Sequence, residues 1–204
     1  MGKIILIFVI GFILQYAIKI YLDEVGYGYH RNLAYISSAI EGTTLILLLN
    51  KYGLDYNFFI YSLLFTVLIT ITFVDLTRKI IPNRLNLAVF IIGLINAMIN
   101  PQSFLSNLGT GFLAGSLFLA IALISGGAMG GGDIKLIAPL GFILGFYSTI
   151  YVILMTFIVG AIVSIALLIM KKAKLMSEVA LAPYITIAVY ILVFANNLIL
   201  DLFN

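Results

Sequence analysis

The chain has 204 residues, of which 63% are hydrophobic and only 9% are charged. A soluble domain is about 45–50% apolar and about 25% charged. A mean hydropathy of +1.21 therefore requires lipid as the solvent for most of the surface. These values exclude a disordered chain, a secreted disulfide scaffold and a nucleic-acid-binding module. The net charge of +3 is then expected to reflect how lysine and arginine are distributed across a membrane.

The residue types that the chain lacks limit its chemistry. It has no cysteine and a single histidine, His30. This excludes disulfides, thiol catalysis and metal sites built from cysteine or from several histidines. No Gly-x-Ser-x-Gly motif surrounds any serine, so a serine hydrolase is not predicted. The remaining reactive groups are carboxylates, hydroxyls, lysines and the backbone.

Eight apolar segments follow one another, and their lengths predict an all-α, polytopic transmembrane helix bundle with seven or eight membrane segments. They are residues 4–22, 32–50, 58–75, 85–99, 104–125, 134–146, 148–170 and 179–200. Segment 134–146 is shorter than a full span. No long linker separates the segments, so we expect one integral-membrane domain over 1–204. No small-residue cleavage site follows the first segment, which is therefore expected to be a retained span and not a signal peptide.

The basic residues predict the orientation. If the N-terminus is outside and every segment crosses, only Lys3 and Lys51 lie on the outer face. The other nine of the 11 basic residues lie on or near one face: Lys19, Arg31, Arg78, Lys79, Arg84, Lys135, Lys171, Lys172 and Lys174. The excess of positive charge makes this face cytoplasmic. If segment 134–146 did not cross, the last lysine cluster would lie outside, so we count this segment as a crossing.

Small residues at four-residue spacing predict close packing between helices. The pairs are Gly111/Gly115, Gly126/Gly130 and Gly141/Gly145. Such pairs indicate a tightly packed bundle and do not by themselves indicate an active site.

Asp75 is the first acid at an unusual place. It ends the uncharged run 58–74 and precedes a polar stretch that contains Pro82. Proline cannot donate a backbone hydrogen bond and disfavours helix at the residue before it. We therefore expect the span to stop or kink just after Asp75, at the cytoplasmic edge. The alternative is an ordinary helix-end acid that pairs with Arg78 or Lys79.

Asp133 is the second such acid, and it follows five glycines within residues 126–132. Each glycine would cost a helix about 1 kcal/mol, so an irregular backbone is expected before Asp133. Asp133 then opens segment 134–146, on the same face as Asp75. The alternative is a simple helix cap. A phosphate-binding loop is excluded because the Gly-Lys-Ser/Thr ending is missing.

Two acids at one membrane face allow aspartyl peptide hydrolysis. Two close carboxylates share a proton, so one can activate water while the other donates to a carbonyl. This chemistry needs neither a metal nor a covalent intermediate. Composition and spacing alone leave a transport or structural bundle equally open, since acids in membrane proteins also bind ions and protons.

The two acids lie in motifs that resemble the type IV prepilin peptidase family, which are membrane aspartyl proteases with a Gly-x-Gly-Asp motif. Gly130, Gly132 and Asp133 correspond to that motif, and Lys135-Leu136 continues it. Asp75 corresponds to the first aspartate of the family and is followed, as in the family, by Ile81-Pro82-Asn83. The stretch 180–184 is similar to the start of the family's last helix, and 31–47 is similar to the second span of its bacterial branch.

The resemblance implies a membrane aspartic endopeptidase with Asp75 and Asp133 as the catalytic dyad. Such enzymes remove the short basic leader of prepilins or pseudopilins at the cytoplasmic membrane edge. The expected partners are therefore these substrates and membrane lipid, without nucleic acid, in the plasma membrane of a prokaryote. The glycines before Asp133 would admit an extended substrate strand, because a peptide bond inside a helix is shielded.

The chain departs from many bacterial members, which carry a tetra-cysteine zinc module between the first two spans and also N-methylate the product. Here that loop is only about residues 23–30, and the chain has no cysteine. We therefore expect no metal and no cofactor. The same departure argues against methyl transfer from S-adenosylmethionine, which the sequence leaves open.

Further residues are expected to bind substrate or to shape the site: Gly130, Gly131, Gly132, Lys135, Thr77, Arg78, Asn83 and Glu41. Glu41 lies inside the second span, where it either contacts substrate or pairs with Lys19, and the pair with Lys19 is the preferred interpretation. Two alternative functions come from other classes. One is a small ion- or proton-coupled transporter that uses Asp75 and Asp133, and the other is an inactive scaffold for pilus or secretion assembly.

Overall fold

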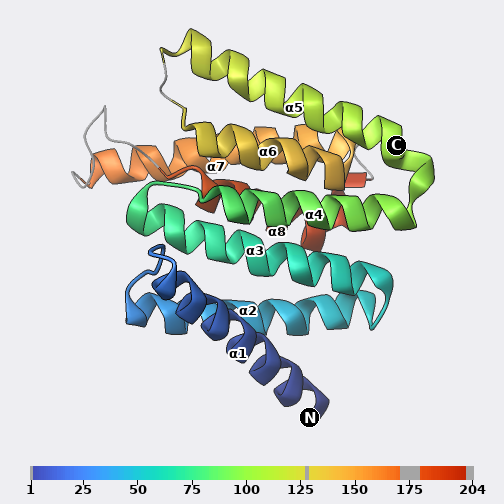
Figure 1. The fold of residues 1–204 in the computed structure, drawn as a ribbon. Coiled ribbons are helices and arrows are strands. Elements are labelled where there is room, and N and C mark those ends of the chain that lie inside the picture. Colours follow the sequence, from blue (N-terminus) through green and yellow to red (C-terminus); the bar gives the residue numbers. More distant parts are fainter. Residues whose placement is uncertain (1, 127–128, 171–179, 201–204) are drawn as a thin grey trace. The chain divides into compact units, whose positions relative to one another are not determined.

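The computed structural model describes residues 2–126, 129–170 and 180–200, the last five of them by their backbone alone. Within these residues the chain forms eight α-helices and no strand (Figure 1). The helices are α1 (Gly2–Glu24), α2 (Arg31–Tyr52), α3 (Tyr56–Arg78), α4 (Asn83–Ile99), α5 (Phe104–Ile124), α6 (Gly131–Leu144), α7 (Phe146–Ile169) and α8 (Ala182–Leu200). A short 3₁₀ turn, η1 (Pro101–Ser103), precedes α5.

The helix lengths and composition confirm an all-α polytopic membrane protein. Five helical segments are long and apolar enough to cross a membrane: α1, α2, α3, Pro101–Ile124 and α7. Helix α4 is apolar but shorter. All eight predicted segments are helices, with ends that differ by a few residues from the prediction. Helix α6 has 14 residues, so its crossing of the membrane stays a prediction.

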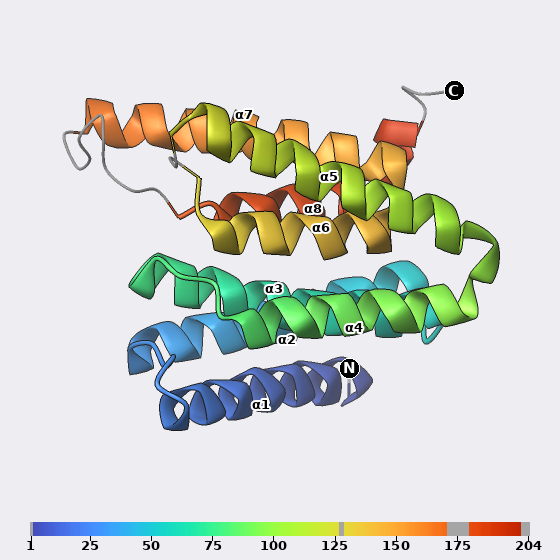
Figure 2. The ribbon, with the colours of Figure 1, turned by 45° about the horizontal axis from the view of Figure 1, so that its top comes forward.

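The described chain divides into two compact units, Met1–Ile92 and Gly93–Asn204, and its organisation as a single domain stays a prediction. The first unit contains α1, α2, α3 and the beginning of α4. Helices α1 and α2 lie against each other (Figure 2) and approach closely at two glycines. A Cβ on Gly11 would lie 3.0 Å from the Cα of Gly42, and a Cβ on Gly42 would lie 2.8 Å from the backbone oxygen of Phe8.

In the second unit, α5 packs on α6 through glycines. A Cβ on Gly111 would lie 2.7 Å from the backbone oxygen of Ala138, and one on Gly141 would lie 3.0 Å from the Cα of Gly111. The predicted packing role of Gly111, Gly115 and Gly141 is therefore confirmed. Gly126 and Gly145 instead allow the chain to turn after α5 and α6, where both have positive φ. Glycine populates this region without the steric cost of a Cβ.

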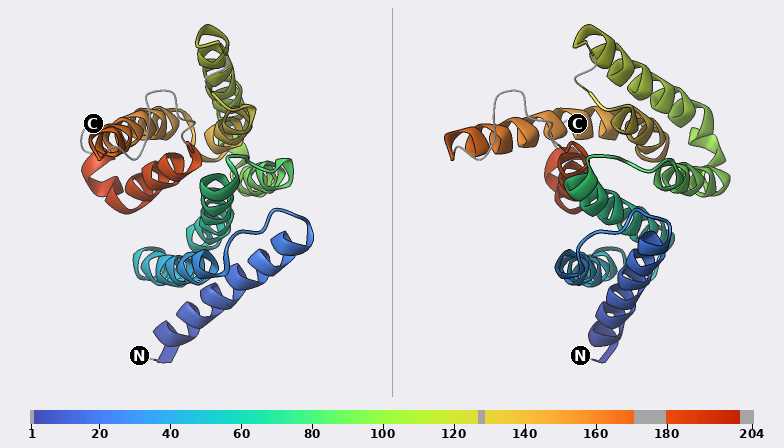
Figure 3. Two further views of the ribbon diagram at one scale, coloured as in Figure 1. Left: turned by 90° about the vertical axis from the view of Figure 1, so that its left-hand side faces the viewer. Right: turned by 60° about the vertical axis from the view of Figure 1, so that its left-hand side comes forward.

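Helices α7 and α8 form the rest of the second unit and lie side by side (Figure 3). Gly160 of α7 faces Tyr184 of α8, whose ring would lie 3.1 Å from a Cβ at that position. Three lysines that the predicted orientation places at the cytoplasmic face lie outside the described residues: Lys171, Lys172 and Lys174.

Gly111→Ala is expected to destabilise the second unit by about 1–3 kcal/mol, because the added methyl group overpacks the α5–α6 contact. Gly109 lies on the same helix, and a Cβ there would meet no atom within 4 Å, so Gly109→Ala is the matched control. The control is expected to have the same unfolding temperature as the native chain, or a slightly higher one. Thermal unfolding of the purified chain in detergent measures both, and equal behaviour of the two variants would contradict the close approach.

Candidate active site

Asp75 lies in the last turn of α3 and is only 5% exposed. The helix does not stop just after Asp75, as the sequence suggested, but continues to Arg78. Lys79 then takes the left-handed conformation with a φ of 57°, and its N–H donates to the backbone oxygen of Asp75 at 2.9 Å. The helix is one turn longer than expected because Pro82 restricts only the residue directly before it. The structure therefore places the acid inside the helix, one turn before its end.

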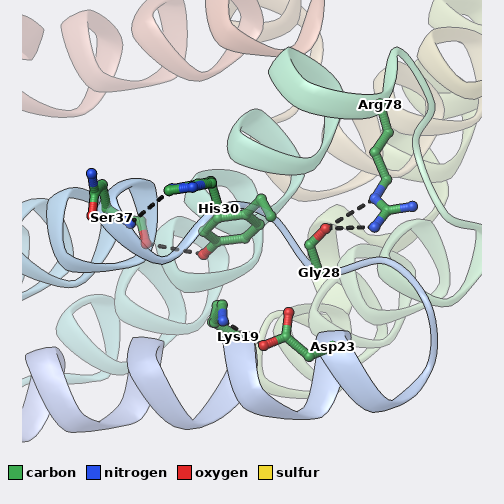
Figure 4. Close-up of polar contacts among 8 residues, drawn as sticks. Lys19, Asp23, Gly28, His30, Ser37 and Arg78 are labelled. Carbon is green, nitrogen blue, oxygen red and sulfur yellow. Dashed lines mark hydrogen bonds and ion pairs between the residues drawn. The ribbon is translucent and has the colours of Figure 1, made fainter.

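Arg78 connects the end of α3 to the loop between α1 and α2. Its Nε and Nη2 atoms donate to the backbone oxygen of Gly28 at 3.0 and 2.7 Å, an interaction that we call the Arg78–Gly28 brace (Figure 4). On the other side of the loop, Lys19 forms an ion pair with Asp23. The carboxylate of Asp23 occupies the position that a Cβ of Gly28 would take. Only glycine fits at this position of the loop, which is held from both sides.

Tyr29 fixes the same loop in the first unit. Its hydroxyl lies 3.0 Å from Oγ of Ser37, which itself donates to the backbone oxygen of Ala34, so Tyr29 is the donor. Its ring stacks on Phe73 at 5.6 Å between centroids, two residues before Asp75. Burial raises the pKa of the Tyr29 hydroxyl, which keeps it protonated and able to donate. The loop therefore packs directly against the turn of α3 that precedes Asp75.

Arg78→Lys is expected to loosen this loop, because an ammonium group cannot reproduce two guanidinium bonds to one oxygen. Hydrogen exchange of the amides in residues 25–30 should become faster than in the native chain. Arg84→Lys is the matched control, since Arg84 makes a single bond of 3.1 Å to the Tyr21 hydroxyl at the same end of the unit. Unchanged exchange in Arg78→Lys would show that the brace does not hold the loop.

Asp133 lies in the first turn of α6, whose N-cap is Gly130. The sequence suggested an irregular backbone up to Asp133. The helix instead begins earlier, with Gly131 and Gly132 as its first two residues. The backbone N–H of Asp133 donates to the oxygen of Gly130 at 3.1 Å. A Cβ on Gly130 would lie 2.9 Å from Oδ2 of Asp133, so the carboxylate folds back over this glycine. Gly130 provides the room that the acid occupies, whereas a Cβ on Gly131 would meet no atom within 4 Å.

The other expected site residues have different environments. The Thr77 hydroxyl donates within its own helix, to the backbone oxygens of Phe73 and Val74 at 2.8 and 3.1 Å. Asn83 is exposed at the start of α4, and Lys135 is exposed in α6. These three residues lie near the acids in the chain, and their part in the site stays a prediction.

The preferred pairing of Glu41 with Lys19 is wrong. Lys19 pairs with Asp23, one turn further along α1, and Glu41 contacts the hydroxyl of Thr66 at 2.6 Å. A pair at (i, i+4) on one helix needs little ordering, whereas Glu41 is 0% exposed in the middle of α2. Contact of Glu41 with substrate stays a prediction.

In the first unit the structure joins the last turns of α3, which carry Asp75, to the loop of Gly28 and Tyr29, and in the second it places the carboxylate of Asp133 over Gly130. The pairing of the two acids stays a prediction, because each belongs to its own unit. Sequence reasoning missed Gly28 and Tyr29. Their partners on α3, Arg78 and Phe73, lie far away in the chain, and no local pattern marks these contacts.

Helices of this length and the buried acid at the end of one of them define a multi-pass membrane protein with polar groups at helix ends. Residues 62–165 match the family model of the type IV leader peptidase family. This match covers about half of the chain and includes both Asp75 and Asp133. The chain belongs to the type IV leader peptidase family.

Curated relatives carry the name prepilin leader peptidase/N-methyltransferase. The chain is 34% identical to that of Aeromonas salmonicida over 135 residues, which are 63% of this chain and 46% of the relative. It is 32% identical to that of Bacillus subtilis over 139 residues, with 66% and 55% covered. It is 27% identical to that of Xanthomonas campestris over 157 residues, with 74% and 55% covered. The chain thus spans about half the length of these relatives, and no solved structure matches it with comparable significance.

Proposed function

We propose that this chain is an aspartic endopeptidase that removes the basic leader from type IV prepilins or pseudopilins. The reaction would take place at the cytoplasmic edge of a prokaryotic plasma membrane, just before the hydrophobic helix of the substrate. Asp75 and Asp133 would form the catalytic dyad. The observation that carries the proposal is the position of Asp75, a carboxylate that is 5% exposed in the last turn of a long apolar helix within the family segment.

The order of the helices supports a dyad on one face. Helices α4 and α5 lie between the two acids in the chain. A chain that crosses the membrane in α4 and again in α5 returns to the face at which α3 ended. Asp133 follows at the start of α6, so the connectivity favours the same face for both acids. This face also carries most of the basic residues in the predicted orientation.

The proposed mechanism is attack by water without a covalent intermediate. The ionised member of the dyad takes a proton from water, whose oxygen bonds to the scissile carbonyl carbon. The protonated member donates its proton to the carbonyl oxygen and stabilises the tetrahedral intermediate. The carbon–nitrogen bond then breaks as the leaving amine takes the proton that the first acid removed from water, and the second acid recovers its proton from the hydroxyl that becomes the product carbonyl. Two acids that share one proton supply both roles.

Cleavage of a co-expressed prepilin tests this function. The native chain is produced in a prokaryotic host that lacks its own leader peptidase, together with a prepilin that carries a basic leader. A decrease in substrate mass by the leader is expected, with a new N-terminus at the hydrophobic helix. A prepilin with an altered cleavage site is the control and should stay intact.

The two other classes of function predict different results in the same cells. A transporter would leave the prepilin intact and move ions or protons across proteoliposomes, with a dependence on Asp75 and Asp133. A scaffold would leave the prepilin intact and move no ions. The retention of both acids in the matched segment favours the peptidase over the scaffold.

A further inference from the structure

A network of buried polar side chains connects the middle parts of the first three helices. Gln15 of α1, Glu41 of α2 and Thr70 of α3 are each 0% exposed, and Thr66 of α3 is 5% exposed. All four lie near the midpoints of helices that are long and apolar enough to cross a membrane. Neither proposed catalytic acid belongs to this network, so the network requires its own explanation.

The hydrogen bonds of Thr70 show where a threonine hydrogen goes in these helices. Its Oγ1 lies 2.7 Å from the backbone oxygen of Thr66, four residues earlier, and receives a hydrogen bond of 3.1 Å from Nε2 of Gln15. The hydroxyl hydrogen is therefore given to the helix, and the oxygen accepts from the neighbouring helix. Thr43 and Thr44 also donate to the residue four positions earlier, at 2.8 and 2.7 Å.

Thr66 has two close oxygen neighbours but carries a single hydroxyl hydrogen. Its Oγ1 lies 2.8 Å from the backbone oxygen of Ser62 and 2.6 Å from Oε1 of Glu41. If Thr66 donates to Ser62, as Thr70 donates to Thr66, the hydrogen in the contact with Glu41 must come from Glu41 itself. A carboxylic acid can supply this hydrogen, whereas a carboxylate only accepts.

The second oxygen of Glu41 leads to the same conclusion. Its Oε2 is buried and has no hydrogen-bond partner among the described residues. An ionised carboxylate would leave negative charge on this oxygen without a donor, in the middle of a membrane span, where such a charge is costly. A neutral acid needs only its single hydroxyl hydrogen to be accepted, and Oγ1 of Thr66, 2.6 Å from Oε1, is free to accept it if Thr66 donates to Ser62.

No charged side chain of the packed helices compensates Glu41 within the described residues. Helices α1 and α3 pack against α2, and their charged residues lie toward the helix ends: Lys3, Lys19, Asp23 and Glu24 on α1, and Asp75 and Arg78 on α3. The titratable residues nearer the middle are Tyr16, which stacks on Tyr35, and Tyr61, which stacks on Tyr52. Glu41 forms no ion pair with any of them.

We propose that Glu41 is a proton-binding site inside the membrane span, which keeps its proton at neutral pH and donates it through Oε1 to Thr66. The ligand of this site is a proton, and the bound form carries no charge. The three helices can then pack around Glu41 without a counter-ion. The proposal is independent of the peptidase reaction, because it involves neither Asp75 nor Asp133.

Infrared spectroscopy of the isotope-labelled chain tests this proposal. The chain has three glutamates, Glu24, Glu41 and Glu178, and labelling of their carboxyl carbon with ¹³C shifts only their bands. The aspartates keep their unlabelled bands, so a proton shared by Asp75 and Asp133 cannot be mistaken for one on Glu41. The full-length chain in lipid at neutral pH is expected to show one isotope-shifted carboxylic acid band.

Two matched variants assign the band. Glu41→Gln is expected to remove the isotope-shifted acid band completely, while Glu24→Gln, at an exposed position, is expected to remove only carboxylate intensity. An acid band that survives Glu41→Gln would overturn the proposal, as would the loss of carboxylate intensity in that variant. The latter result, with a spectrum that depends on sodium or potassium, would instead indicate an ionised glutamate that binds a cation. If Glu41→Gln does not fold, the native spectrum decides, since the absence of any glutamic acid band overturns the proposal.

Discussion

Asp75→Asn is expected to abolish leader removal, with a loss of roughly 10²–10⁴-fold, the range for deleting a general acid or base. Asparagine has nearly the shape of aspartate but cannot take a proton from water. Because the side chain lies in the last turn of α3, the variant should keep the fold. The initial rate of prepilin cleavage in membranes measures the loss, and thermal unfolding in detergent checks that the helices remain intact.

Asp55→Asn is the matched control for this experiment. Asp55 precedes the other end of the same helix, is exposed, and makes no side-chain hydrogen bond to cap it. Its substitution is expected to leave the cleavage rate at the native level. If Asp75→Asn cleaved as fast as Asp55→Asn, Asp75 would have no part in the chemistry.

The same substitution at Asp133 is expected to give a loss of similar size. If the two acids act as one unit, the double variant should be no slower than the slower single variant, since removing either acid already removes the shared-proton chemistry. Losses that multiply in the double variant would show two independent contributions. That result would contradict the dyad but not the importance of either acid.

Gly130→Ala is expected to slow cleavage by roughly 10²-fold, the cost of misplacing a catalytic group by about 1 Å. The added Cβ would lie 2.9 Å from Oδ2 of Asp133, so the carboxylate has to move. The backbone itself tolerates alanine, because Gly130 has a φ of −67° and a ψ of 137°, which any residue adopts. The expected loss therefore comes from the side chain of Asp133 and not from backbone strain.

Gly131→Ala separates this effect from a general need for flexibility. A Cβ on Gly131 meets no atom within 4 Å, and alanine favours the helix that begins there. Full activity in Gly131→Ala, together with the loss in Gly130→Ala, is the expected pair of results. An equal loss in both variants would mean that the segment must bend during catalysis and would contradict the role assigned to Gly130.

The glycine-rich segment shows why local patterns predict helix ends only approximately. Five glycines before Asp133 suggested an irregular backbone, yet two of them begin α6. A first helical turn leaves its N–H groups without partners inside the helix in any sequence, so a glycine there loses little that another residue would keep. The end of α3 was misjudged for a related reason, since a proline affects its immediate neighbour and not the residues several positions earlier.

The family, the eight helices and the positions of both acids near helix ends followed from the sequence alone. These features depend on residues that are close together in the chain: apolar runs of spanning length, prolines and short motifs. Because each of these features depends on neighbouring residues, a single sequence is enough to predict it.

Only the tertiary structure decided which polar groups meet. It joined Glu41 of α2 to Thr66 of α3 and connected Arg78 to Gly28 over 50 positions. Such contacts depend on how each helix is rotated about its axis and shifted along its neighbour. Close-packed apolar side chains and glycines such as Gly11 and Gly42 set that rotation, and no local pattern encodes it.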